Sequence, residues 1–277
     1  MTSCWLPAAI QTYQTACSRT ARWRSRIRIT RTVAPVPGWF PEIRWWRCTS
    51  LQNRLWLQAL KSFYNSQYQV AEHISAPLAE EAKVTLKVSQ NLHASMTPYI
   101  LGAIVGKATV KIDQKGFALE HEFLTKAGLD LSGASQADGA GGAASAFYTP
   151  DFMVRYLAYM ASQPIYPIFE RALPILGRDG TLVNIQHDSP AAGHVFAKTG
   201  TFDSFDLLNM QNMLEGKGLA GYTTTPSGQH LAFALYVNHV ELPDDPDATD
   251  VIAGEALGAI ATAVYALPID KSALDAH

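Results

Sequence analysis

Apolar residues in the first patterned part of the chain recur at helical spacing. This spacing predicts a helix at 55–66, and residues 74–106 predict a proline-started amphipathic helix followed by a second, more apolar helix that begins near Ser89. A further helix is predicted over 110–128, where Gly128 ends it.

Residues 129–150 are too rich in glycine, alanine and serine to form a helix or a strand throughout, so they are predicted to be a long loop. A helix then starts at Thr149-Pro150-Asp151, because proline costs no hydrogen bond in a first turn and aspartate favours the positive end of the helix dipole. The apolar side of this helix carries Met153, Val154, Leu157 and Met160.

The last third of the chain changes to the period of strands. Strands are predicted at 194–201, 218–225 and 230–240, with a tight connection at 225–229. The segment 201–217 is expected to be an insertion or a long turn, and 251–267 an alanine-rich helix able to lie flat on a sheet. These elements predict an α+β fold, an antiparallel sheet flanked by helices.

Charge divides the chain into two parts. The first 56 residues hold nine arginines and one acidic residue, Glu42, together with every cysteine and tryptophan. The rest holds 13 basic against 23 acidic residues, so its formal charge is −10. We therefore predict an extension at 1–56, poorly structured or non-native, and a folded domain at 57–277. A basic, aromatic arm for nucleic acid or anionic lipid is the less favoured interpretation of the extension.

Composition excludes several classes of function. The formal net charge of −2 predicts no nucleic-acid partner. Three unpatterned cysteines fit neither a disulfide framework nor a zinc site, and no cofactor or metal is predicted. The sequence shows no signal-peptide pattern and no apolar run of membrane-spanning length.

Three short elements carry candidate chemistry: Ser89-Gln90-Asn91, the glycine-rich stretch from Asp138 to Gly141, and Lys198-Thr199-Gly200. Each alone has an ordinary explanation. A serine at a helix start is commonly an N-cap, and a lysine at a strand end is commonly solvated. Their order and flanking sequence, however, resemble the C-terminal half of serine D-alanyl-D-alanine carboxypeptidases, the class C low-molecular-mass penicillin-binding proteins. The resemblance covers most of residues 70–240.

Acyl transfer from a peptide with a free carboxylate requires an activated serine, a cation for the carboxylate and an oxyanion hole. Lys198 and Thr199 are predicted to hold the carboxylate, and Gly200 leaves room for substrate backbone to lie along the strand. Ser89 is expected to meet Lys198 and relay a proton to the leaving amine.

The resemblance adds further expectations. It implies that the amide of Thr201 forms half of the oxyanion hole and that Asn91 binds the substrate amide. It also implies a β-lactamase/transpeptidase-like fold and a setting on peptidoglycan, periplasmic or extracellular. The expected partners are peptide or ester small-molecule substrates and β-lactams.

The sequence departs from the family in two places. No serine is followed by a lysine three residues later, so the Ser-x-x-Lys element of the nucleophile is missing. Ala140 and Ala143 also replace the two serines that the family carries in its glycine-rich loop. The first hypothesis is therefore the substrate-side half of a carboxypeptidase, with doubtful activity of its own.

Two alternatives remain open at this stage. One is a promiscuous carboxylesterase that uses Ser89 with Lys198, or that takes His93, His187 or His194 as its base; a surface or packing role is the ordinary interpretation of each histidine. The other is a non-catalytic, vestigial binding module. A sheet without its first strands would also expose an edge, so the chain is predicted to recruit its N-terminal segment or to form homo-oligomers.

Overall fold

The computed structural model describes residues 72–142, 146–243, 245 and 247–268. Residues from Leu78 onward belong to one compact unit, whereas the first six described residues belong to another and have no regular structure. The predicted helix at 55–66 and the predicted boundary after residue 56 lie outside the described residues.

Two helices pack closely because glycines line their contact. Helix α5 (Asn91–Ile100) continues into a π-helical turn, η3 (Leu101–Val105), and α6 (Ile112–Lys126) packs beside them. A Cβ atom at Gly116 would lie 1.9 Å from the Pro98 carbonyl oxygen, so only glycine fits there. Of the two helices predicted within 74–106, the first is α4 (Leu78–Lys87), and Gly128, with φ of +77°, follows the end of α6 as predicted.

The predicted loop at 129–150 contains short regular pieces, the 3-10 turn η4 (Leu131–Gly133) and the two-residue strands β1 (Ala134–Ser135) and β2 (Phe147–Tyr148), which pair with each other. Helix α7 (Pro150–Ala161) then starts as predicted, with the Thr149 side chain accepting a hydrogen bond from the Phe152 amide at 3.2 Å.

The main sheet has the order β3-β4-β5, and β6 also pairs with β4. Its strands are β3 (Val195–Asp206), β4 (Gln211–Thr224), β5 (His230–Val237) and β6 (Val240–Leu242). The interpretation of 201–217 as an insertion or long turn was wrong, because β3 and β4 continue through it and turn only at 207–210. Residues 203–205 are all exposed, and the register shifts after Phe202, so the alternation of sides is hidden there.

The last predicted strand also divides in the structure. Residues 230–240 are not one strand, since β5 ends at Val237 and His239, with φ of +54°, lies between β5 and β6. Of the described strands, β5 pairs with β4 alone, so its outer edge is open. Association through this edge stays a prediction.

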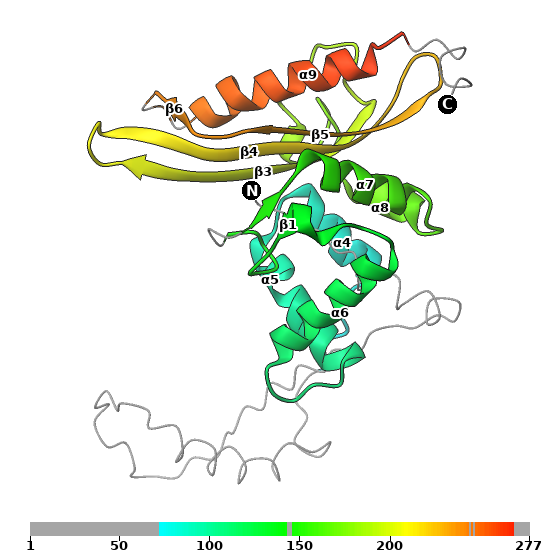
Figure 1. The fold of residues 1–277 in the computed structure, drawn as a ribbon. Coiled ribbons are helices and arrows are strands. Elements are labelled where there is room, and N and C mark those ends of the chain that lie inside the picture. Colours follow the sequence, from blue (N-terminus) through cyan, green and yellow to red (C-terminus); the bar gives the residue numbers. More distant parts are fainter. Residues whose placement is uncertain (1–71, 143–145, 244, 246, 269–277) are drawn as a thin grey trace, which may run out of the picture. The chain divides into compact units, whose positions relative to one another are not determined.

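Helices cover both faces of the sheet (Figure 1). On one face, α7 and the unpredicted helix α8 (Tyr166–Ala172) form a core with Tyr222, whose hydroxyl donates to the Leu157 carbonyl oxygen at 2.8 Å. On the other face, α9 (Glu255–Tyr265) packs on Val195, Ala197 and Leu219. The prediction of an antiparallel sheet flanked by helices is confirmed.

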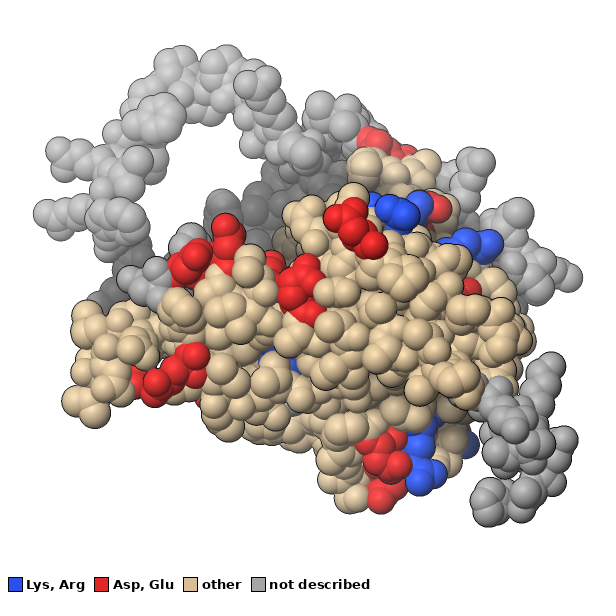
Figure 2. Space-filling model, turned by 90° about the horizontal axis from the view of Figure 1, so that it is seen from above, with Lys and Arg blue, Asp and Glu red and all other residues tan. Residues whose placement is uncertain are grey.

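The described surface offers little that suggests a membrane span or a metal centre. Within the described residues, no helix combines the length and apolar character that a bilayer crossing needs. The same residues contain no group of three or more histidine, cysteine or acidic side chains placed to hold a metal ion. The face seen in Figure 2 carries scattered acidic and basic side chains without a continuous basic patch.

Replacing Gly221 by alanine tests how tightly β3 and β4 meet. The added Cβ would lie 2.0 Å from the Phe196 carbonyl oxygen, so Gly221→Ala should lower the free energy of unfolding by about 3 kcal/mol or more. Urea denaturation followed by circular dichroism measures the change. Gly142→Ala is the control, because its nearest neighbour would be 3.8 Å away. Equal stability of the two variants would contradict this packing.

Candidate active site

Ser89 lies in the tight turn that joins α4 to α5. The Gln90 amide donates to the Thr85 carbonyl oxygen at 3.0 Å, the six-to-one bond of a Schellman motif. Ser89 occupies the left-handed position of that motif, with φ of +56°, where glycine is the usual residue. Serine therefore costs about 1–2 kcal/mol more than glycine in this conformation.

Ser89 is not the N-cap of α5. Gln90 is the N-cap of α5, because its side-chain oxygen accepts a hydrogen bond from the Leu92 amide at 3.0 Å. The Ser89 hydroxyl is thereby left for another partner. Asn91 is the first residue of α5, and its side chain is exposed.

That partner is Lys198, which lies on β3, 109 residues further along the chain. Its ammonium nitrogen donates to Ser89 Oγ at 2.9 Å and to the Thr199 carbonyl oxygen at 2.6 Å. Only 2% of Lys198 is exposed, so these acceptors offset a large part of the cost of burying its charge. The structure therefore brings the first and third sequence elements together.

In the described part of the chain, Pro174 and Leu176 pair with the first residues along the outer edge of β3. The Leu176 amide donates to the Val195 carbonyl oxygen at 3.0 Å, and the Ala197 amide donates to the Pro174 carbonyl oxygen at 2.9 Å. Beyond this point, no other described strand pairs with that edge. The part of this edge with which no other described strand pairs begins after Ala197.

Backbone alternation decides which groups face this open edge. Since Val195 and Ala197 direct their backbone groups outward, Thr199 and Thr201 do so too, because both precede the register shift. Gly200 lies between them and is buried. Lys198, Ser89 and the outward amides and carbonyls of two threonines thus meet at one edge.

A loop braces this edge against α4. The Lys87 ammonium donates to both Asp179 carboxylate oxygens, at 2.8 and 2.7 Å, and the Thr181 hydroxyl lies 2.7 Å from that of Thr199. The Asp179 carboxylate also accepts from the Ile175 amide at 2.8 Å. No sequence motif indicates these residues, because Lys87 and Asp179 are 92 positions apart and each is an ordinary residue type.

A second buried lysine lies behind the edge. Lys217 faces Thr201 across β3 and β4, and its ammonium contacts Asp250 Oδ1 at 2.6 Å and Thr201 Oγ1 at 3.4 Å. The Thr201 side chain therefore faces the α9 side of the sheet, while its backbone faces the edge. No motif in the sequence indicates Lys217 either.

The glycine-rich loop folds around Asp138. The Asp138 carboxylate accepts hydrogen bonds from the amides of Ala140, Gly141 and Gly142, and a Cβ at Gly139 would lie 2.2 Å from the Ala94 carbonyl oxygen of α5. These contacts explain the aspartate and the glycines of the loop as structural requirements. They also place the loop directly against α5, the helix that follows Ser89.

The three candidate histidines have neighbours of their own. His93 Nδ1 lies 3.4 Å from a Glu81 carboxylate oxygen, and His187 Nδ1 lies 2.9 Å from the neighbouring Asp188 carboxylate. His194 stacks on Tyr265 with ring centroids 5.1 Å apart. The Ser89 hydroxyl accepts a hydrogen bond from Lys198, so Lys198 rather than a histidine is the basic residue next to this hydroxyl.

This geometry agrees with comparisons to known proteins. The sequence model of the D-Ala-D-Ala carboxypeptidase 3 (S13) family matches residues 51–257. The chain belongs to this family. A D-alanyl-D-alanine carboxypeptidase from Actinomadura sp. (strain R39) is 30% identical over 189 residues, which are 66% of this chain and 32% of that protein.

Solved structures show the same fold. Penicillin-binding protein 4 from Haemophilus influenzae, in complex with a β-lactam, matches with a TM-score of 0.60 at 21% identity, over 78% of this chain and 51% of that chain. The TLA-1 extended-spectrum β-lactamase matches with a TM-score of 0.52 at 16% identity, over 94% of this chain and 81% of its own. The predicted family and the β-lactamase/transpeptidase-like fold are confirmed. This chain spans about a third of the carboxypeptidase and about half of penicillin-binding protein 4.

The left-handed backbone at Ser89 can be tested by comparing two substitutions. Both Ser89→Gly and Ser89→Ala remove the hydroxyl, but only alanine keeps the Cβ that disfavours positive φ. The glycine variant should be more stable by about 1 kcal/mol in urea denaturation.

Ser95, inside α5, provides the matched control. There the order should reverse, with Ser95→Gly less stable than Ser95→Ala by about 1 kcal/mol. The same order of stability at both positions would contradict the left-handed turn.

Proposed function

We propose that this chain forms the substrate side of a serine acyl-hydrolase site of the D-alanyl-D-alanine carboxypeptidase type, acting on peptidoglycan-like peptides. The observation that carries the proposal is the 2.9 Å hydrogen bond from Lys198 to Ser89 at the open edge of β3. It joins a cation, a hydroxyl and a strand edge with which no other described strand pairs beyond Ala197, and such groups bind a peptide ending in a carboxylate.

Each residue then has a distinct role. The Lys198 ammonium and the Thr199 hydroxyl hold the terminal carboxylate, and the substrate backbone lies along Gly200 as an added strand. The amide of Thr201, which points to the same edge, supplies one donor for the oxyanion. Ser89 transfers a proton toward the leaving amine, and the exposed amide of Asn91 binds the substrate amide.

The same groups suit β-lactams, which carry a carboxylate beside a reactive acyl group. Penicillin-binding protein 4 from H. influenzae, which shares the fold, has been solved in complex with one. A peptidoglycan substrate implies that the protein acts where peptidoglycan lies, in the periplasm or outside the cell. We infer these ligands and this location from the family to which the chain belongs.

A second candidate function follows from the position of Ser89. None of the serines in the 277 residues is followed by a lysine three residues later, so the Ser-x-x-Lys nucleophile is not in this sequence. Ser89, hydrogen-bonded to a buried amine in a strained turn, is the serine best placed to be activated. With Lys198 as its base, it would hydrolyse simple esters, as a carboxylesterase does.

Carboxylate recognition is tested with a peptide ending in D-alanyl-D-alanine and with its C-terminal amide. The free acid should bind at least about tenfold more tightly than the amide, because a charge-assisted hydrogen bond is lost in the amide. Ligand-observed NMR measures both affinities. In Lys198→Met the two ligands should bind equally, whereas Lys126→Met, which removes an exposed lysine of α6, should keep the preference. No preference in the unmodified protein would contradict the proposal.

The nucleophile is tested with a fluorophosphonate and a labelled penicillin, followed by mass spectrometry of the modified peptide. Labelling of Ser89, lost in Lys198→Met, is the expected result for the esterase. It should be accompanied by hydrolysis of p-nitrophenyl acetate that falls at least 100-fold in Ser89→Ala. Label on another serine would overturn the role of Ser89, and absence of label with retained peptide binding would indicate a non-catalytic binding module.

A further inference from the structure

A cavity of about 550 Å³ lies between α6, α7 and the β1–β2 pair. This volume is within the range of small-molecule sites. None of the residues from Ser89 to Asn91 or from Lys198 to Thr201 lines it, so it is separate from the candidate active site. Helices α6 and α7 and the paired strands β1 and β2 contribute to its walls.

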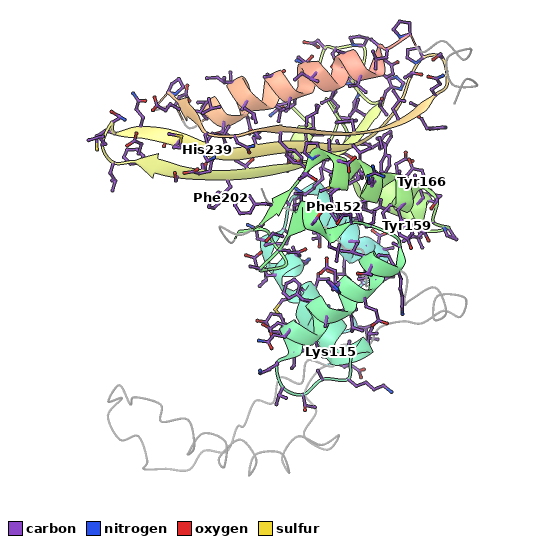
Figure 3. All side chains as sticks on the ribbon, viewed as in Figure 1. Lys115, Phe152, Tyr159, Tyr166, Phe202 and His239 are labelled. Carbon is purple, nitrogen blue, oxygen red and sulfur yellow. The ribbon has the colours of Figure 1, made fainter. Side chains whose placement is uncertain are left out.

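The walls are largely aromatic and aliphatic. Phe117 and Leu124 of α6 face Phe152 and Met153 of α7, and the Tyr148 ring stacks on Phe152 with centroids 5.8 Å apart. Figure 3 shows Phe152 on the side of α7 toward α6. Such a surface favours a flat apolar ligand, which buries its faces between the rings.

One charged group gives the cavity its selectivity. Glu120 of α6 is the sole acidic residue among those that line it, and neither lysine nor arginine is among them. Burial raises the pKa of Glu120 to about 7. Two residues further on, Glu122 lies outside the cavity, and its hydrogen bond with Lys126 lowers the pKa of that carboxyl.

The charge of the Glu120 carboxyl determines which class of ligand the cavity favours. An anionic ligand would meet Glu120 with no lysine or arginine in the lining to balance either charge, and a neutral ligand would leave the carboxylate without an ionic partner. An ammonium group supplies both a charge and three hydrogen-bond donors. Ser135 and Gln136 line the same cavity and offer further acceptors, while the rings of Tyr148 and Phe152 attract a cation through their faces.

We propose that this cavity is a second ligand site, which binds a small primary amine with an aromatic body. The ammonium group of the ligand pairs with the Glu120 carboxylate, and its ring lies against Tyr148 and Phe152. The site is independent of the proposed hydrolase function, since it shares none of its residues.

Binding is tested on the full chain with tryptamine, using ligand-observed NMR. Tryptophol carries a hydroxyl and indole-3-acetate a carboxylate in place of the amine, on the same ring. Tryptamine should bind with a dissociation constant on the order of 1 mM or below, at least about tenfold tighter than either analogue. Equal binding of the three, or no saturation by tryptamine, would overturn the proposal.

Two glutamates of α6 supply matched variants. Glu120→Gln keeps the shape of the side chain, removes a carboxyl whose ionisation burial opposes, and is therefore expected to fold; thermal denaturation checks this. Tryptamine affinity should fall at least about tenfold in Glu120→Gln, with tryptophol affinity unchanged. Glu122→Gln should bind tryptamine as the unmodified protein does. An effect of the same size in both variants would refute the pairing with Glu120.

The pH dependence gives an independent check. Glu120 must be ionised to pair with the ammonium, and with its pKa about 7 its ionised fraction rises roughly tenfold from pH 6 to pH 8, while an alkylammonium stays charged. Tryptamine affinity should rise with it and stay flat in Glu120→Gln. The other titratable groups that line the cavity are His121, Tyr148 and Tyr156. A rise that disappears in His121→Gln and persists in Glu120→Gln would contradict the assignment.

Discussion

The hydrogen bond between Lys198 and Ser89 is the contact on which the arrangement of this edge depends. A buried ammonium needs acceptors, and the two recorded here are a side-chain hydroxyl from the helical part and a carbonyl oxygen of its own strand. Lys198 can reach both acceptors only if the α4–α5 turn packs against β3. The Lys87–Asp179 ion pair and the Thr181–Thr199 contact hold the same two parts together from the side.

Sequence patterns predicted the helices and strands that are determined by residues close together in the chain. The helix after Thr149 follows from a capping side chain and a proline, and the three strands that carry the core follow from short apolar runs bounded by turn residues. The β3 side of the hairpin tip was missed because residues 203–205 are all exposed, which removes the alternation there. Helix α8 was also missed; it has seven residues and two prolines flank it closely in the sequence.

Prediction of the site was limited for a different reason. Ser89 and Lys198 could be found because each belongs to a short motif with known companions. The contacts of Asp179, Thr181 and Lys217 with Lys87, Thr199 and Thr201 join residues at least 16 positions apart, which no local motif indicates. The Glu120 cavity was likewise invisible, since its lining comes from two helices and a loop that meet only in the folded chain.

The left-handed turn at Ser89 also restricts which hydroxyl residue can stand there. Threonine carries the same reactive group, but its branched Cβ makes positive φ a severe outlier. Glycine would relax the backbone and remove the hydroxyl. Ser89 therefore has no conservative substitution. Glycine fits the backbone but lacks the hydroxyl, whereas threonine keeps the hydroxyl but does not fit the backbone.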